Sequence, residues 1–213
     1  MYIDLKNFLK KNNIYIQGVI HIGAHKGEEL WLYKKLKIKK ILLFEANPSL
    51  ITFLKIKIFF YKFFFNLQVF LEKLAVSNKV GKVNFKITSN SQSSSILDFK
   101  YHAIQYPDIK KIKEIIIPST TLNKIFAEKY SIKDYNMLNM DIQGAELMVL
   151  TGATNILNKI DLIYTEINFK QMYKNCATAK QLDFFLKKYG FYRSMTLTPQ
   201  SKYWGDAIYL KKK

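Results

Sequence analysis

The chain has 213 residues, of which 49% are hydrophobic and 23% are charged, so its composition is that of a globular protein and excludes a disordered chain. Basic residues outnumber acidic ones by 34 to 16, which gives a net charge of +18. This excess raises the possibility of a nucleic-acid binder, but Arg193 is the only arginine, and arginine is the residue best suited to bidentate phosphate and base contacts. The abundance of lysine, isoleucine, asparagine, phenylalanine and tyrosine indicates instead a gene of AT-rich composition. Cys176 is the single cysteine, which excludes an internal disulfide and a multi-cysteine metal site.

Strands and helices alternate along almost the whole sequence, as the spacing of the apolar residues indicates. This order predicts an α/β fold with a mostly parallel sheet. No helix separates the last two strands, which predicts an antiparallel pair at one edge. We expect one domain over residues 1–213, with residues 88–95 as a surface loop. In the first half of the chain the expected elements are a helix at 4–11, a strand at 16–22, a helix at 28–36, a strand at 41–44, a helix from Pro48 to about 60, and strands within 67–76 and at 83–87. In the second half they begin with a strand at 115–117 that Pro118 ends and a helix to about 129 that Thr120 or Thr121 caps. A strand at 137–142, a helix at 145–157, a strand at 162–167, a helix at 178–189 ended by Gly190, and strands at 191–197 and 207–210 follow.

No segment has the run of ~20 apolar residues that a membrane-spanning helix needs. The most apolar stretch, 51–71, is interrupted by Lys55, Lys57 and Lys62. The first residues also lack the apolar core and cleavage site of a signal peptide. We therefore expect a soluble cytoplasmic protein that does not associate with membranes.

A glycine-containing turn joins the strand at 16–22 to the helix that follows it. Gly23 permits the tight turn, and Gly27 lets a ligand approach the helix N-terminus, whose free N–H groups favour a carboxylate or phosphate. Glu45 ends the next strand, where a carboxylate can accept hydrogen bonds from both hydroxyls of a ribose. A dinucleotide fingerprint is excluded, because His25 stands where a second glycine is required. The spacing suits S-adenosylmethionine better than NAD, although any strand–helix turn can carry two glycines.

The most specific string is Asn139-Met-Asp-Ile-Gln-Gly-Ala-Glu146. Asp141 emerges at the C-terminal end of a buried strand, which is where α/β sheets bind ligands. It could be the general base, could orient an ammonium group of the cofactor, or could cap the helix that starts at Gly144. Glu146 lies in the first turn of that helix, where the helix dipole alone favours an acid.

With this string the chain resembles the FkbM family of S-adenosylmethionine-dependent methyltransferases, from about Val19 to Leu210. The resemblance implies a class I, Rossmann-like methyltransferase fold: a seven-stranded, mostly parallel sheet with one antiparallel strand and helices on both faces. It also implies O-methylation, often of sugars or secondary metabolites. The matching strings are Ile22-Gly-Ala-His-Lys-Gly-Glu-Glu29, Phe44-Glu-Ala-Asn-Pro48, Ala75-Val-Ser77, Ser93-Ser-Ser-Ile-Leu97, Thr121-Leu-Asn123, Asp141-Ile-Gln-Gly-Ala-Glu146, Thr165-Glu-Ile-Asn168 and Trp204-Gly-Asp-Ala207.

The chain departs from the family pattern at two positions. Many members have an acid at the position of His21, and in those members this acid usually contacts the amino group of the cofactor. Many also have glutamate in place of Gln143, so this chain has one carboxylate fewer beside Asp141. The second change disfavours a divalent metal, and we expect no metal.

Together these observations give a set of candidate site residues. Glu166 and Asn168 end the strand at 162–167, on the same sheet edge as Asp141 if the two strands are neighbours; a solvated strand end is the alternative for Glu166. A second carboxylate there would let one act as base while the other binds substrate. The catalytic candidates are Asp141 and Glu166; the cofactor-binding candidates are His21, Gly23, His25, Gly27, Glu45, Ala75 and Asp141; the substrate-binding candidates are Ser94, Ser95, Asn168, Tyr173 and Trp204.

The sequence thus predicts an S-adenosylmethionine-dependent O-methyltransferase that acts on a sugar hydroxyl of a glycan or a nucleotide-sugar, including deoxy- and amino-sugars. The expected acceptor is a small molecule or glycan and is anionic, as a nucleotide-sugar would be; no specific nucleic-acid partner is expected. An RNA ribose 2′-O-methyltransferase is one alternative. Such enzymes use a Lys-Asp-Lys-Glu set whose final glutamate lies late in the chain, and the last glutamate here is Glu166. A non-catalytic relative that binds nucleosides or glycans is the other alternative.

Overall fold

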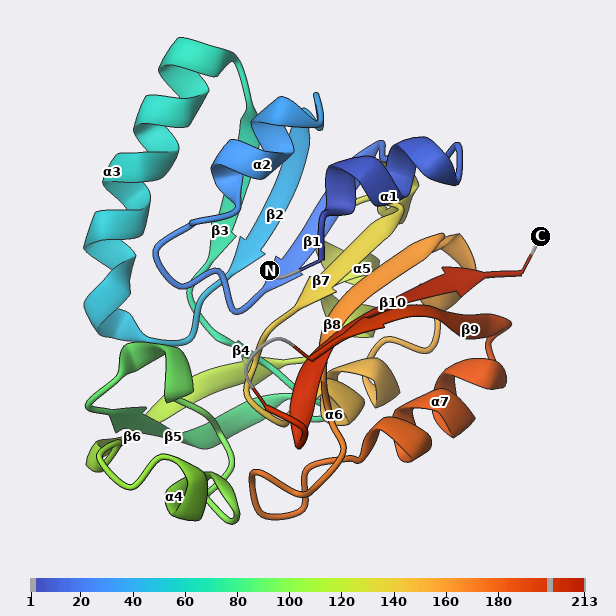
Figure 1. Cartoon of the computed structure of the whole chain (residues 1–213). Coiled ribbons are helices and arrows are strands. Elements are labelled where there is room, and N and C mark those ends of the chain that lie inside the picture. The colour runs from blue at the N-terminus through green and yellow to red at the C-terminus, as the bar shows by residue number, and fades with distance from the viewer. Residues whose placement is uncertain (1–2, 199–200, 213) are drawn as a thin grey trace.

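The computed structural model describes residues 3–198 and 201–212, which form a seven-stranded sheet and a smaller three-stranded one (Figure 1). The large sheet has the order β3 (Gln68–Glu72), β2 (Lys40–Phe44), β1 (Gly18–Ile22), β7 (Met137–Met140), β8 (Leu162–Asn168), β10 (Trp204–Lys211) and β9 (Phe191–Leu197). Strands β3 to β8 in this order pair in parallel, and β10 is antiparallel to both of its neighbours. The predicted α/β class and the antiparallel pair at one edge are confirmed.

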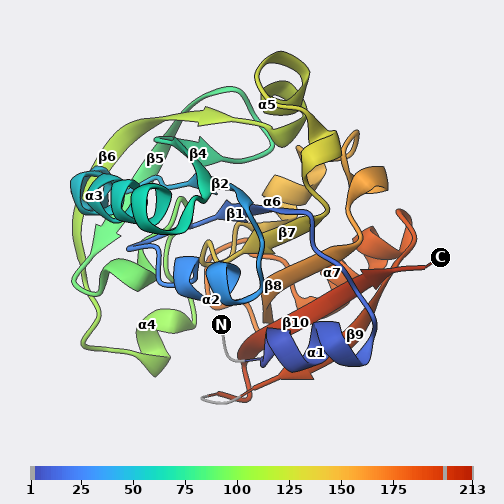
Figure 2. The ribbon, with the colours of Figure 1, turned by 90° about the horizontal axis from the view of Figure 1, so that it is seen from above.

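Helices cover both faces of the large sheet, because its buried strands alternate their apolar side chains between two cores. Val19 and Ile41 pack with α1 (Leu5–Lys11), α2 (Leu30–Lys35) and α3 (Pro48–Phe65). Their neighbours Ile20 and Leu42 pack on the other face with α5 (Leu122–Glu128), α6 (Glu146–Thr151) and α7 (Ala179–Lys187). Figure 2 shows α1 and α2 on the opposite side of the strands from α5.

The three-stranded sheet was not predicted as a separate unit. It has the order β4 (Ala75–Val76), β6 (Lys111–Thr120) and β5 (Gly81–Thr88), and the connection from β5 to β6 contains the short helices η1 (Ser91–Ser93) and α4 (His102–Gln105). The prediction that Pro118 ends a strand at 117 is wrong, since Pro118 lies inside β6 opposite Lys82. β4 pairs only with Ser119 and Thr120, so β6 has a single neighbour at Pro118 and no ladder bond is lost there.

Two helix boundaries also differ from the prediction. α3 continues past residue 60 to Phe65 and ends at Asn66, which has a left-handed φ of 51°. α6 ends early, at Thr151, and its C-cap is Gly152, where a side chain would collide with the carbonyl of Ser77. Further single turns are η2 (Ile132–Asp134) and η3 (Leu157–Lys159). Among the described residues, no helix is both long and apolar enough to cross a bilayer.

Candidate functional site

A cavity of about 480 Å³ opens at the carboxyl edge of the large sheet. The connections after β1 and β7 run in opposite directions along this sheet, and such a switch point is where open α/β sheets bind ligands. Residues that follow β1, β2 and β7 line the cavity, as do residues of β8 and β10 and the loop 90–96 between β5 and β6. The predicted site edge and the predicted polar loop therefore face one another across this cavity.

The turn after β1 is held tightly between the ends of β2 and β7. Gly23 has a φ of 85°, and a side chain on it would collide with the carbonyl of Asp141. The N–H groups of Gly23 and Ala24 both donate to the carbonyl of Phe44, at 3.0 Å. The requirement for glycine at position 23 is thus conformational as well as steric.

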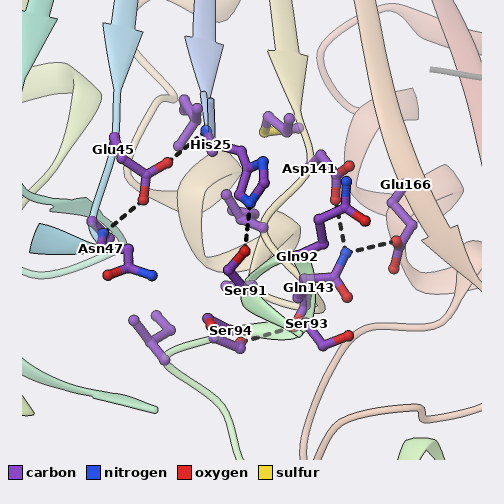
Figure 3. A pocket seen from close by; sticks show the side chains of 18 of the residues that line it. His25, Glu45, Asn47, Ser91, Gln92, Ser93, Ser94, Asp141, Gln143 and Glu166 are labelled. Carbon is purple, nitrogen blue, oxygen red and sulfur yellow. Dashed lines mark hydrogen bonds between the residues drawn. The ribbon is translucent and has the colours of Figure 1, made fainter. Parts of the chain in front are cut away.

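Glu45 follows β2 and connects the first turn to the start of α3. One carboxylate oxygen accepts the N–H of His25 at 2.6 Å, and the other accepts the N–H of Asn47 at 2.6 Å (Figure 3). The side chain is buried, and this burial raises its pKa above the ordinary glutamate value. Glu45 lines the cavity with a fixed orientation and with lone pairs left for a ligand.

His21 lies at the inner end of the cavity in a buried hydrogen-bonded chain. The side-chain amide of Asn139 donates to the Tyr33 hydroxyl at 2.8 Å, and that hydroxyl lies 3.2 Å from Nδ1 of His21. Because the hydroxyl accepts from Asn139, its proton is directed at Nδ1, which leaves the histidine proton on Nε2. Burial lowers the pKa of His21, so its ring is neutral at pH 7.

His25 joins the turn after β1 to the serine-rich loop. Its Nδ1 lies 2.8 Å from a carboxylate oxygen of Glu28, and its Nε2 lies 2.7 Å from the hydroxyl of Ser91. Figure 3 shows Ser91 between the histidine ring and the rest of the loop. The loop is held at its other end as well, since the Ser95 hydroxyl donates to the carbonyl of Gln143 at 2.9 Å.

Gln143 connects the two candidate catalytic carboxylates. Its side-chain amide donates to Asp141 at 2.8 Å and to Glu166 at 3.1 Å (Figure 3). Its amide oxygen accepts the Tyr173 hydroxyl at 2.5 Å. Its φ of 57° places the side chain between the ends of β7 and β8. Many family members have a glutamate at position 143. The glutamine of this chain instead places a neutral hydrogen-bond donor between the carboxylates of Asp141 and Glu166.

The two carboxylates have different surroundings. Asp141 is accessible from the cavity, but its deep position raises its pKa, and the charge of Asp206 adds to this. Glu166 is buried, and burial together with the charge of Asp141 holds its pKa well above the ordinary value. The pKa of Glu166 is therefore raised more than that of Asp141, so Glu166 has the stronger tendency to stay protonated.

The lining of the cavity differs in charge from the rest of the chain. Among the described residues that line it there are six carboxylates and neither a lysine nor an arginine; the acids are Glu28, Glu29, Glu45, Asp141, Glu166 and Asp206. This lining favours a cationic or neutral ligand over an anionic one. No three histidine, cysteine, aspartate or glutamate side chains within residues 3–198 and 201–212 are arranged to hold a metal ion.

An aromatic group closes the side of the cavity next to β8 and β10. Tyr173 and Trp204 line it, and the Trp204 ring N–H donates to the Tyr106 hydroxyl at 3.0 Å. His102 is stacked on Phe99 with ring centroids 4.3 Å apart, and burial lowers its pKa to about 4. This part of the lining is aromatic and uncharged.

Most of the predicted site residues line the cavity, but two do not. A side chain on Gly27 would meet Leu54 and Leu30, so this glycine permits close packing of α2 on α3 and does not face a ligand. Asn168 is buried behind Glu166, to which its amide donates at 3.4 Å. Those that do line it are His21, Gly23, His25, Glu45, Ala75, Ser94, Ser95, Asp141, Glu166, Tyr173 and Trp204.

Among the lining residues that the sequence analysis did not assign to the site are Ser91, Gln143 and Asp206. Ser91 was passed over for the serines that follow it, and Gln143 was read only as the loss of an acid. Asp206 accepts the Tyr164 hydroxyl and lies opposite Glu166 in the pairing of β10 with β8. Its position in the string Trp204-Gly-Asp-Ala207 was the one available signal for it. Glu146, in contrast, lies outside the cavity and accepts the N–H of Gly144 at 3.1 Å.

Comparison with known proteins shows the family of this chain. The family model described as "Methyltransferase FkbM domain" matches residues 21–192. The chain belongs to the FkbM methyltransferase family. The 2-O-methyltransferase NoeI of Sinorhizobium fredii (strain NBRC 101917 / NGR234) is 26% identical over 111 residues, which are 49% of this chain and 45% of NoeI.

Solved structures show the same fold. Methyltransferase FkbM from Methylobacillus flagellatus KT has a TM-score of 0.58 and 14% identity, and the match covers 91% of this chain and 43% of that one. Magnesium protoporphyrin IX methyltransferase ChlM from Synechocystis PCC 6803, solved with bound S-adenosylmethionine, has a TM-score of 0.52 and 9% identity over 97% of this chain and 76% of its own. This FkbM family chain covers less than half the length of NoeI and of the Methylobacillus protein.

Membership of the FkbM family makes S-adenosylmethionine the cofactor of this chain. The residues of the cavity fit that molecule. Its sulfonium and ammonium groups are both cationic, which suits a lining of carboxylates without lysine or arginine. Glu45 offers a fixed carboxylate at the end of β2, and Gly23 keeps side-chain atoms out of the turn beside it.

Proposed function

We propose that the chain is an S-adenosylmethionine-dependent O-methyltransferase whose acceptor is a sugar hydroxyl. The observation that carries this proposal is the pair of carboxylates, Asp141 and Glu166, joined by the amide of Gln143 beside the glycine turn. Methylation of a hydroxyl requires removal of its proton, which a positioned carboxylate can accept. The relative NoeI is named as a 2-O-methyltransferase, which supports the same reaction class.

We assign the cofactor to the side of the cavity formed by β1 and β2. Glu45 would accept hydrogen bonds from the ribose hydroxyls, and the turn from Gly23 to His25 would surround the methionine part. Ala75 supplies an apolar surface at the edge of this region, and His21 supplies its Nε2–H. When bound, S-adenosylmethionine supplies a methyl group already activated on a sulfonium.

The residues around β7 and β8 would then orient the acceptor and take its proton. Asp141 is the base in this proposal, because it is open to the cavity whereas Glu166 keeps its own proton more strongly. The protonated Glu166 can donate a hydrogen bond to the acceptor, a division of roles that follows from pKa values driven apart. Gln143 fixes the distance between them.

The side chains that line the cavity restrict the chemical class of acceptor that it would bind. Trp204 is partly exposed and presents a flat surface of the kind that packs against a sugar ring, while Tyr173 is a buried part of the same wall. The absence of lysine and arginine among the described lining residues means that phosphates would find no cationic partner inside. We therefore favour a neutral or amine-bearing sugar of a glycan, and a nucleotide-sugar would keep its phosphates outside the cavity.

Replacement of Asp141 by asparagine tests the proposed base. Asp141→Asn keeps the shape of the side chain and its contact with Gln143, but it removes the proton acceptor. Turnover with a methylated acceptor should fall by about 10²–10⁴-fold, while the affinity for S-adenosylhomocysteine changes by no more than about threefold. The matched control is Asp134→Asn, which makes the same chemical change near the other end of β7, where Asp134 pairs with Lys40.

Two outcomes would overturn parts of this proposal. Loss of cofactor affinity with unchanged turnover at saturation would make Asp141 a cofactor ligand. Failure of the wild-type chain to transfer a labelled methyl group to any sugar in a panel of glycans and amino-sugars, with cofactor binding intact, would favour a non-catalytic relative.

A further inference from the structure

One long face of α3 carries large apolar side chains that point away from the core. Each is between 51% and 73% exposed, although the same helix buries Leu50, Leu54 and Ile58 on its inner side. Figure 1 shows α3 at the outer edge of the molecule, beside β3. We call these residues the outer face of α3: Phe53, Ile56, Phe59, Phe60, Phe63 and Phe64.

These six positions form one continuous surface. At about 100° per residue, they fall within an arc of about 140°, opposite to the buried residues. Phe59 stacks with Phe63 at 6.1 Å between centroids, and Phe60 lies against Phe64 at 4.2 Å. The rings thus contact one another along the helix, and each is more than half exposed in the described structure.

Lysines border this apolar arc on both sides. On the same projection Lys57 lies at one edge, and Lys55 and Lys62 lie at the other. The helix contains no acidic residue between Pro48 and Phe65. Lys55 also lies close enough to Lys73 to lower its pKa, so positive charges accumulate here.

The neighbouring helix α2 (Leu30–Lys35) also pairs a lysine with aromatic rings, where it meets the inner side of α3. Lys34 lies over the ring of Trp31 at 4.3 Å and over the ring of Phe65 at 4.1 Å. Trp31 is 45% exposed. Aromatic rings flanked by lysines are therefore presented by two adjacent helices.

We propose that the outer face of α3 docks the chain on the surface of an anionic lipid bilayer. An interfacial helix buries its phenylalanines among the acyl chains near the headgroups, while flanking lysines meet the lipid phosphates. A second copy of the chain is a poorer occupant, because a symmetric contact through this face would bring the lysine rows of both copies together. The sequence predicts no membrane association, and the exposure of these rings, which only the structure reveals, leads to the opposite proposal.

Co-sedimentation with lipid vesicles tests the proposal. The whole chain is mixed with vesicles of phosphatidylcholine alone or with roughly one-third phosphatidylglycerol. We expect binding to the anionic vesicles, weaker binding to the neutral ones, and a decrease at high salt. Phe59→Ser with Phe63→Ser should lower the partition coefficient by about tenfold or more, and Lys55→Gln with Lys62→Gln by roughly tenfold.

The matched control is Phe184→Ser on α7. Phe184 is 67% exposed and Lys188 lies 4.5 Å from its ring, but α7 packs on the opposite face of the sheet. This variant should bind vesicles like the wild type. Circular dichroism and binding of S-adenosylhomocysteine verify that every variant is folded, and these readouts do not depend on the docking surface.

The proposal would be overturned by wild-type binding that is equal on neutral and anionic vesicles or absent from both. It would also be overturned if Phe184→Ser reduced binding as much as the α3 variants. A shift from dimer to monomer in the phenylalanine variant, measured by analytical ultracentrifugation without any vesicle binding, would identify the face as a contact between copies of the chain.

Discussion

Glu45 holds together two segments that border the cavity. Its carboxylate holds the N–H groups of His25 and Asn47, so it fixes the glycine turn and the start of α3 at the same time. The buried side chain is also part of the cavity lining. The Glu45 carboxylate therefore stabilises the fold at this point, whether or not a cofactor is bound.

The first prediction concerns cofactor affinity. Glu45→Ala should weaken the binding of S-adenosylhomocysteine by about 1.5–3 kcal/mol, the contribution of a hydrogen bond to a charged group. Isothermal titration calorimetry measures this directly, with Glu128→Ala as the control, since Glu128 is an exposed acid of α5 paired with Lys124. An unchanged dissociation constant in a folded Glu45→Ala protein would remove the ribose assignment.

The second prediction concerns Glu146 and the dependence of stability on pH. Burial raises the pKa of Glu146 from 4.5 to about 7, so the folded chain binds a proton that the unfolded chain has already released in this range. The free energy of unfolding should therefore fall as the pH rises from 4.5 to 7, by at most about 3 kcal/mol from this group. Urea denaturation at several pH values measures the slope.

Glu146→Gln provides the comparison for that slope. The amide oxygen of glutamine can still accept the N–H of Gly144, but it cannot titrate. The variant should lose part of the fall in stability between pH 4.5 and 7, whereas Glu128→Gln should retain it. A Glu146→Gln protein whose stability changes with pH in the same way as that of the wild type would contradict the assignment of the raised pKa.

At the scale of elements, the N-cap of α5 gives the third prediction. The Thr121 hydroxyl accepts the N–H of Lys124 at 3.1 Å, as the sequence predicts for a helix beginning at 121 or 122. Thr121→Ala should cost about 0.5–2 kcal/mol of stability, because it leaves that N–H without its partner. Thr52→Ala, at an exposed position inside α3, should change stability by no more than about 0.5 kcal/mol. Equal effects of the two substitutions would show that the cap contributes nothing.

The elements that could be predicted are those in which local signals agree. The strands β1, β2, β7 and β8 are continuous apolar runs bounded by turn residues, and they were placed correctly to within a few residues. The small sheet of β4, β5 and β6 could not be derived in this way. Its pairings join Ala75 with Ser119 and Gly81 with Ser119, contacts about forty residues apart that no local pattern encodes.

For the site as well, only the residues with a local sequence signal could be predicted. Glu45 and Asp141 could be predicted because each ends a buried strand, and all parallel strands end at one edge of the sheet. Asp206 comes from the antiparallel strand β10, whose register beside β8 decides that it meets Glu166. The role of Gln143 as a link between two acids depends on its left-handed φ, which the sequence alone does not reveal for a glutamine.

At the scale of the whole molecule, the distribution of charge matters more than its sum. The net charge is +18, yet the described lining of the cavity has six acids and neither a lysine nor an arginine. Arg193, the one arginine, forms a bidentate pair with Asp183 at 3.0 and 2.9 Å, between β9 and α7. The residue best suited to nucleic-acid readout is therefore engaged in holding the edge strand.

This distribution leads to the last prediction, that RNA is not the methyl acceptor. Lysines on the surface release counterions from any polyanion, so non-specific RNA binding is expected at low salt and should weaken steeply as salt rises. A neutral or amine-bearing sugar in an acidic cavity makes few such contacts, and its methylation should depend much less on salt. The measurement is transfer of a labelled methyl group to capped RNA and to a panel of glycans, amino-sugars and nucleotide-sugars at two salt concentrations. Site-specific labelling of RNA at physiological salt, with none of the sugars labelled, would reverse the assignment, because it would require phosphates to be accepted next to carboxylates that repel them.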